Sequence, residues 1–95
     1  MKKYEIMFIV RPTLTDEDIK KVATSFEKVL KDNGASEIKV QEMGQRELAY
    51  EINKFKTGYY FFYEVEADAE AIAEFNRVVG INECVLRHLV VKKED

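Results

Sequence analysis

The chain has 95 residues, of which 46% are hydrophobic and 35% charged, and its 15 basic and 18 acidic residues give a formal net charge of −3. This balance predicts a single globular domain over residues 1–95 and excludes a disordered tail or linker. The longest uncharged apolar run, Ile6 to Val10, is far shorter than the ~20 residues of a membrane-spanning helix, so we expect no membrane partner. The single cysteine, Cys84, excludes an internal disulfide framework and fits a reducing cytosol.

The first part of the chain predicts a strand followed by a helix. Residues 2–10 alternate at period two, and Pro12 ends this strand because proline cannot continue a β-ladder. Thr15 is a suitable N-cap for the helix, and an apolar stripe at helical spacing follows it. The pair Asn33-Gly34 is a typical left-handed stop signal.

The middle of the chain predicts two strands joined by a turn. Residues 36–52 form a long strand, which Gly44 interrupts at a bulge or twist. Beyond Gly44 the apolar residues resume on the same even-numbered parity, which predicts one continuous face. We expect the turn over residues 53–57 and the next strand over 58–66, with Tyr59 rather than its neighbour on the core face.

The last part of the chain predicts a second helix, which Asp68 caps and Gly80 ends, and a final strand over residues 84–92. A right-handed crossover places the first two strands parallel with a gap between them, which the third strand fills antiparallel. The second crossover puts the fourth strand beside the first. The predicted fold is therefore α+β, a ferredoxin-like split β-α-β sandwich. Its four-stranded antiparallel sheet has the order 4-1-3-2, with two helices on one face.

The sheet face without helices, called the open face below, is the first candidate for function. We expect it to display six apolar side chains: Met7, Ile9, Tyr60, Phe62, Leu89 and Val91. A patch of this size on a small protein is typical of a contact with protein, ligand or nucleic acid. A scatter of single apolar residues would instead be ordinary surface.

Charge is distributed unevenly along the chain. Residues 84–93 contain three basic residues and no acid, a local charge of +3, whereas residues 64–75 contain five acids and no base. A basic edge attracts phosphate, although an ordinary solvated surface explains the same pattern. Arg46 follows Gly44 at the bend of a long strand, and arginine is suited to bidentate phosphate contact.

The residues suggest no enzyme. His88 lies within the last predicted strand without a neighbouring carboxylate to orient it, which favours a packing role. The four glycines stand far apart, so no glycine-rich loop could hold a phosphate. With one histidine and one cysteine, we expect no metal site, no cofactor and no small-molecule substrate.

Three segments resemble one known family, and together they extend over essentially the whole chain. The strongest match is residues 44–54, GQRELAYEINK, which are similar to the arginine, Leu-Ala-Tyr and isoleucine run on the second strand of the bacterial ribosomal protein S-six family. Residues 1–6 and 85–92 are similar to that family's first and last strands. Glu47 stands where the family often has a second basic residue, and Glu51 where it often has proline.

The resemblance implies a non-catalytic structural protein of the small ribosomal subunit, which places it in the cytoplasm on the ribosome. It also implies binding to the central domain of small-subunit ribosomal RNA together with ribosomal protein S-eighteen, by a chain that is monomeric when free. The basic positions that match the family pattern are the RNA-contact candidates Lys2, Arg46, Arg87 and Lys92, and Lys3 is a weaker candidate. The open face then becomes the interface for the protein partner. The net charge of −3 predicts weak RNA binding by the chain alone, with the partner supplying positive charge.

Two other functions stay open on the residues alone. A stand-alone RNA-recognition module shares this strand order and stacks bases on sheet aromatics, and residues 56–63 are similar to its third-strand motif. Thr57 and Tyr60 depart from that motif. The other alternative is a dimeric ferredoxin-like ligand-binding regulatory domain, since a fold alone does not determine function.

Overall fold

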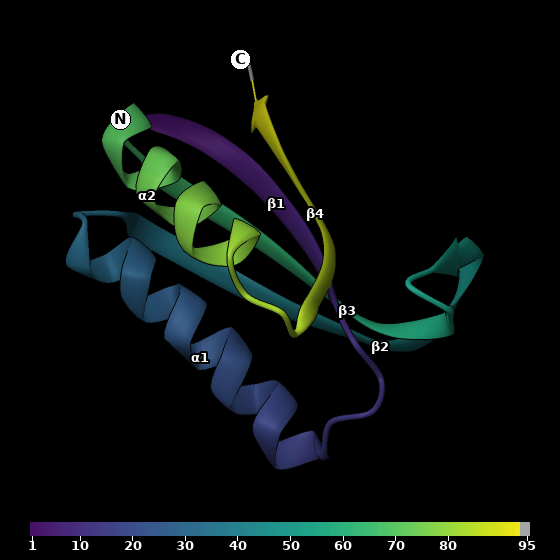
Figure 1. Cartoon of the computed structure of the whole chain (residues 1–95). Coiled ribbons are helices and arrows are strands. Elements are labelled where there is room, and N and C mark those ends of the chain that lie inside the picture. Colours follow the sequence, from purple (N-terminus) through teal and green to yellow (C-terminus); the bar gives the residue numbers. More distant parts are fainter. Residues whose placement is uncertain (94–95) are drawn as a thin grey trace.

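The computed structural model describes residues 1–93, so the last two residues of the expected 1–95 domain lie outside it. Its elements follow the predicted order: β1 (Lys2–Val10), α1 (Asp16–Asp32), β2 (Ser36–Ile52), β3 (Phe55–Ala67), α2 (Ala69–Gly80) and β4 (Val85–Lys93). The strands form one sheet in the order β2-β3-β1-β4, and every neighbouring pair is antiparallel. Both helices lie over the same face of this sheet (Figure 1). The predicted topology is confirmed.

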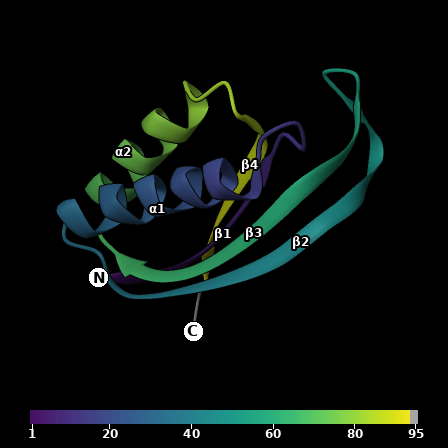
Figure 2. The ribbon, with the colours of Figure 1, turned by 90° about the horizontal axis from the view of Figure 1, so that it is seen from below.

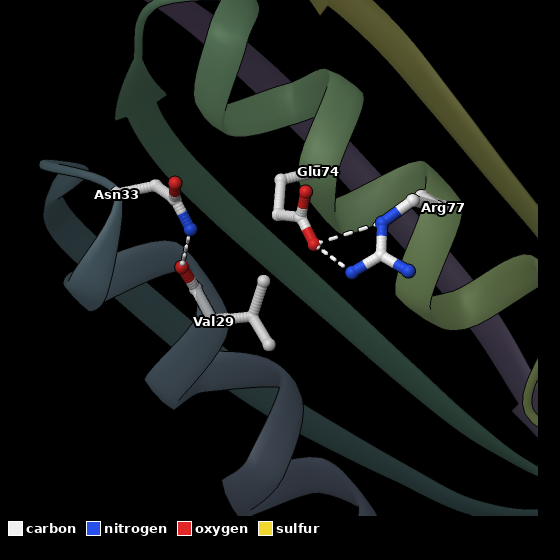
Figure 3. A network of polar contacts seen from close by, with 4 residues as sticks. All are labelled: Val29, Asn33, Glu74 and Arg77. Carbon is white, nitrogen blue, oxygen red and sulfur yellow. Dashed lines mark hydrogen bonds and ion pairs between the residues drawn. The ribbon is translucent and has the colours of Figure 1, made fainter.

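Capping signals delimit α1 as predicted. The Thr15 hydroxyl accepts a hydrogen bond from the Asp18 amide at 3.2 Å, which stabilises the first turn. At the other end Gly34 adopts a φ of +88°, and Asn33 Nδ2 donates to the Val29 carbonyl at 2.8 Å (Figure 3). These contacts satisfy backbone groups that the helix ends leave without intrahelical partners.

The start of α2 differs in one detail from the prediction. Asp68 occupies the N-cap position, but its side chain makes no capping hydrogen bond. Its carboxylate instead faces the Met1 amino group at 3.9 Å. Within the helix, Arg77 Nε donates to Glu74 Oε1 at 3.0 Å (Figure 3), and this hydrogen bond lowers the pKa of the Glu74 carboxyl. Neither helix within residues 1–93 is long and apolar enough to cross a membrane.

The core lies between the helices and the inner face of the sheet. The Phe8 ring of β1 stands 5.1 Å from the Phe26 ring of α1, measured between centroids. It also stands 5.0 Å from Phe61 and 5.2 Å from Tyr63, both on β3. The Tyr63 hydroxyl donates to the Ala23 carbonyl at 2.9 Å, so the one polar atom of this ring cluster has a partner.

The two adjacent tyrosines of β3 face opposite sides of the sheet. Tyr59 pairs with Val10, and its ring centroid lies 5.2 Å from that of Phe61, on the helix side. Tyr60 pairs with Ile9 on the open face. The prediction for these two residues is confirmed.

The bulge predicted at Gly44 is present, but it reverses the faces of β2. Gly44 has a φ of +83°, and the register between β2 and β3 shifts at this point. Before the bulge, even-numbered Val40 pairs with Tyr63 on the helix side. After it, even-numbered Arg46 pairs with Gly58 on the open side. The prediction of one continuous even-numbered face is wrong, because one extra residue in a bulge inverts the alternation.

The turn between β2 and β3 is tighter than predicted. Ile52 pairs with Phe55, so only Asn53 and Lys54 form the turn, with positive φ angles of 50° and 70°. Two consecutive left-handed residues are typical of a two-residue hairpin loop, whose twist matches that of the strands. The predicted turn over residues 53–57 is wrong because its last residues already pair as strand. The hairpin extends past the rest of the sheet and curls there (Figure 2).

Candidate functional site

The apolar residues predicted for the open face form a continuous strip across three strands. Cross-strand pairing places Leu89, Met7 and Phe62 in one row, and Tyr60 lies in the next row. Leu89 is 54% exposed and Val91 is 47% exposed, whereas the other three are half-buried. The structure therefore brings together five of the six predicted interface residues as accessible surface.

Ile9, the sixth residue, is covered by the chain itself and is only 9% exposed. A Cβ atom added at Gly58 would overlap Ile9 Cγ2, and Leu48 Cδ2 lies 3.5 Å from the same position. Ile9 thus packs against the β2–β3 hairpin, although its register places it on the open face. Its contribution is to hold the hairpin, and in its row only Tyr60 is part of the accessible strip.

Charged residues border the strip at the end where β1 begins. Lys3 pairs with both Glu66 and Lys93, and Lys93 Nζ lies 3.6 Å from a Glu5 carboxylate oxygen. Three lysines and four glutamates line a cavity of about 110 Å³ at this end. Because both signs are interspersed, this part of the face has little attraction for phosphate.

The five basic RNA-contact candidates do not form one patch. Lys2 and Lys92 lie on the helix side of the sheet, at the end where β1 begins and β4 ends, and Lys3 lies nearby on the open side. Arg46 and Arg87 lie on the open side near the other end. At about 3.3 Å per residue, the two groups are roughly 20 Å apart along β1.

The β2–β3 hairpin brings further basic residues to the end that holds Arg46 and Arg87. Lys54 lies in the exposed turn, and Lys56 follows it at the start of β3. Arg11 follows β1, and its Cζ atom lies 5.7 Å from the centroid of the Phe55 ring. We call these five basic residues the basic end: Arg11, Arg46, Lys54, Lys56 and Arg87. The hairpin also carries Glu47 and Glu51, and Glu83 precedes Cys84, whose carbonyl accepts from the Arg11 amide, so the charge of this end is 5 − 3 = +2.

Sequence reasoning missed three residues of the basic end. The predicted turn over residues 53–57 contains both Lys54 and Lys56, whereas the structure keeps Lys54 in the two-residue loop and places Lys56 on β3. Asn53 is the local signal for such a tight loop, because asparagine tolerates a positive φ angle. Arg11 has no comparable sequence signal, because its proximity to Phe55 depends on how the hairpin curls past β1.

Arg87 is held by the hairpin. Its Cζ atom lies 5.2 Å from the centroid of the Tyr50 ring, and its Nη1 donates to the Tyr50 hydroxyl. Arg46 is exposed, and its Nε donates to the Met43 carbonyl of the bulge at 3.2 Å. The two arginines are thus oriented by contacts of the chain, with guanidinium donors still available to a ligand.

The remaining chemistry-bearing residues belong to the packing of the fold. His88 pairs with Phe8 on the helix side and is half-buried. Within residues 1–93, no group of three or more His, Cys, Asp or Glu side chains could hold a metal ion. In the same range every buried side-chain nitrogen and oxygen has a hydrogen-bond partner. These observations leave the open face and the basic end as the candidate functional surfaces.

Comparison with known proteins gives the relatives of this chain. Residues 3–92 match the model of a family described as Ribosomal protein S6. The chain is 53% identical over 95 residues, all of both chains, to small ribosomal subunit protein bS6 of Halalkalibacterium halodurans. It is 51% identical over 94 residues, 99% of each chain, to the protein of the same name from Shouchella clausii. The crystal structure of 30S ribosomal protein S6 from Thermotoga maritima matches with a TM-score of 0.92 and 26% identity, over 97% of this chain and 87% of that one.

Proposed function

The chain belongs to the ribosomal protein S6 family of small-subunit structural proteins, which are not enzymes, and on that premise we propose that it binds ribosomal RNA together with ribosomal protein S-eighteen. The RNA would be the central domain of the small-subunit RNA. The observation that carries this proposal is the presence of two different surfaces on one sheet: an accessible apolar strip and a separate basic end. The family match over residues 3–92 argues against a stand-alone RNA-recognition module and against a dimeric regulatory domain.

The apolar strip supports the protein contact. Leu89 and Val91 are large apolar side chains with about half of their surface exposed, and they continue into half-buried Met7 and Phe62. Continuous apolar surface of this kind is stabilised when another protein covers it. We assign the strip to ribosomal protein S-eighteen.

The basic end supports the RNA contact. Its local charge of +2 stands against a net charge of −3 for the whole chain, which supports this end as the part that attracts phosphate. Arg46 is exposed and uses only one of its guanidinium donors within the chain, so its other donors can meet a phosphate. Lys2, Lys3 and Lys92 at the opposite end would make a second, weaker contact, since acids surround Lys3.

Binding measurements with purified components test this function. The chain alone should bind a central-domain RNA fragment weakly, because its net charge is −3. Addition of ribosomal protein S-eighteen should raise its affinity by about 5- to 150-fold, the usual range of coupling between two ligands. Equal affinity with and without the partner would contradict the joint binding that we propose.

Substitution of the exposed arginine tests the RNA surface. Arg46→Ala should weaken assembly of the three-component complex by roughly tenfold, the effect of losing one charged hydrogen bond. Its thermal unfolding should change little, because the side chain is exposed. Lys28→Ala on α1 removes the same charge far from the basic end and should leave assembly unchanged. A large drop in the melting temperature of the Arg46 variant would show that Arg46 has a structural role instead.

A further inference from the structure

The contact between Tyr50 and Arg87 joins the two edge strands of the sheet. Tyr50 belongs to β2 and Arg87 to β4, and the sheet order places β3 and β1 between them. The hairpin curls far enough for the Tyr50 hydroxyl to accept a hydrogen bond from Arg87 Nη1. The Tyr50 side chain is nevertheless 57% exposed, so this residue contributes little to the core.

Arg46 lies on the same strand as Tyr50, four residues before it. Arg46 pairs with Gly58 on the open side, and Leu48 lies close to Gly58 there as well. The register of β2 shifts again between Glu47 and Ile52, so the contact with Arg87, and not alternation, places the Tyr50 side chain on this side. Arg46 therefore belongs to the strand segment that Tyr50 attaches to β4. The other strand of the hairpin has its own attachment, because Arg11 Cζ lies 5.7 Å from the Phe55 ring centroid.

We propose that Tyr50 is a positioning residue for RNA binding: it orients the Arg87 guanidinium and sets its spacing from Arg46, so that both meet the phosphates of one RNA segment. This proposal rests on the function proposed above. The ring holds the guanidinium by a cation–π contact, and the hydroxyl occupies Nη1. Nε and Nη2 make no hydrogen bond within residues 1–93, and together they form the fork that fits a phosphate.

A guanidinium oriented in advance binds more tightly, because less side-chain freedom is lost when the phosphate arrives. Tyr50 would then affect RNA affinity through Arg87 and without a phosphate contact of its own. This gives the proposal a signature that separates it from direct RNA contact: the effects of the two residues must be coupled.

The test is a double-mutant cycle on RNA affinity, measured with ribosomal protein S-eighteen present and at several salt concentrations. Tyr50→Leu should weaken binding by about 3- to 10-fold, as expected for loss of a cation–π contact. It should leave the slope of log K against log salt unchanged, whereas Arg87→Ala should reduce that slope by about one. In the Arg87→Ala background, Tyr50→Leu should have little further effect. Tyr50→Phe keeps the ring and should retain most of the affinity.

Equal losses from Tyr50→Leu in both backgrounds would overturn the proposal, because Tyr50 would then act independently of Arg87. An unchanged RNA affinity of Tyr50→Leu in the chain that keeps Arg87 would overturn it as well. A second measurement keeps the test separate from the proposed function: hydrogen exchange of the Arg87 Nη1–H group, which donates to the Tyr50 hydroxyl, in the free protein, followed by NMR. Faster exchange in Tyr50→Leu supports the contact between Tyr50 and Arg87. Failure of the parent complex to bind RNA would refute only the proposed function and not this contact. Unchanged exchange would refute the positioning role.

Discussion

The Tyr63 hydroxyl is inside the core, where it donates to the Ala23 carbonyl at 2.9 Å. Burial, followed by the nearby Glu27 and Glu42 carboxylates, raises the pKa of Tyr63 above its ordinary value of 10.0. The folded chain therefore keeps this phenol protonated at pH values at which the unfolded chain releases the proton. The corresponding stability is fully present below pH 10 and is lost as the pH rises above it.

Removal of this hydroxyl should have two measurable effects. Tyr63→Phe should lower the free energy of unfolding at pH 7 by about 0.5–1.5 kcal/mol, the usual net value of one hydrogen bond. It should also reduce the loss of stability above pH 10, because this ionisation no longer opposes folding. Urea denaturation at pH 7 and above pH 10 measures the two effects. Tyr4→Phe is the control, because it removes the hydroxyl of a tyrosine that is only half-buried. Identical pH dependence of Tyr63→Phe and the parent would contradict the assignment.

Among the elements of the fold, the β2–β3 hairpin depends on one close approach between strands. At Gly58 the hairpin passes over Ile9, and a side chain at this position would overlap Ile9 Cγ2. The bulge at Gly44, with its φ of +83°, reverses the faces of β2 and directs Arg46 to the open side. Two glycines thus permit the backbone path that builds the basic end.

Gly58→Ala should be destabilising because the added methyl group forces Ile9 or the hairpin to move. We expect a loss of about 1–3 kcal/mol in the free energy of unfolding, the usual cost of overpacking. Gly80→Ala is the matched control, because no atom lies within 4 Å of its added Cβ and alanine is the better helix former. Urea denaturation compares the two variants. Equal stability of both would show that the hairpin can shift away from Ile9 without cost.

At the scale of the whole molecule, the sheet separates the two surfaces that we propose for binding. The helices cover its inner face, and the outer face divides into the apolar strip and the basic end. Leu89 and Val91 lie on β4, an edge strand, so a partner can reach them without moving any other element. The proposed protein and RNA contacts therefore do not compete for the same surface.

The protein surface can be tested at Leu89, which is 54% exposed and so can be changed without opening the core. Leu89→Asp should abolish co-elution with ribosomal protein S-eighteen in gel filtration, because it places a charge inside the apolar contact. Ile81→Asp is the control: Ile81 is 69% exposed but follows α2, away from the strip, and its variant should still co-elute. Retention of the complex by Leu89→Asp would mean that the partner binds elsewhere. Ile9→Asp would be a poor test, since Ile9 is 9% exposed and its loss would disturb the fold.

The order of the elements and the order of the strands could be predicted from sequence alone. Capping residues such as Thr15 and Gly34 act within a few residues, and period-two and helical patterns are equally local. Crossover handedness then leaves few arrangements of the strands. The same local patterns indicated the apolar strip, because alternation along a regular strand decides which face each side chain occupies.

The hairpin could not be predicted in this way, and it decides the form of the candidate site. The bulge at Gly44 inverts the alternation, so the face of Arg46 depends on register with β3. The burial of Ile9 and the contact of Tyr50 with Arg87 arise because the hairpin curls beyond the end of the sheet and brings its side chains back to β1 and β4. Such contacts join residues far apart in the chain, and they depend on the accumulated twist of the strands, which no local pattern records. Local chemistry therefore determined which residues could bind, whereas the three-dimensional path of the backbone decided which of them act together.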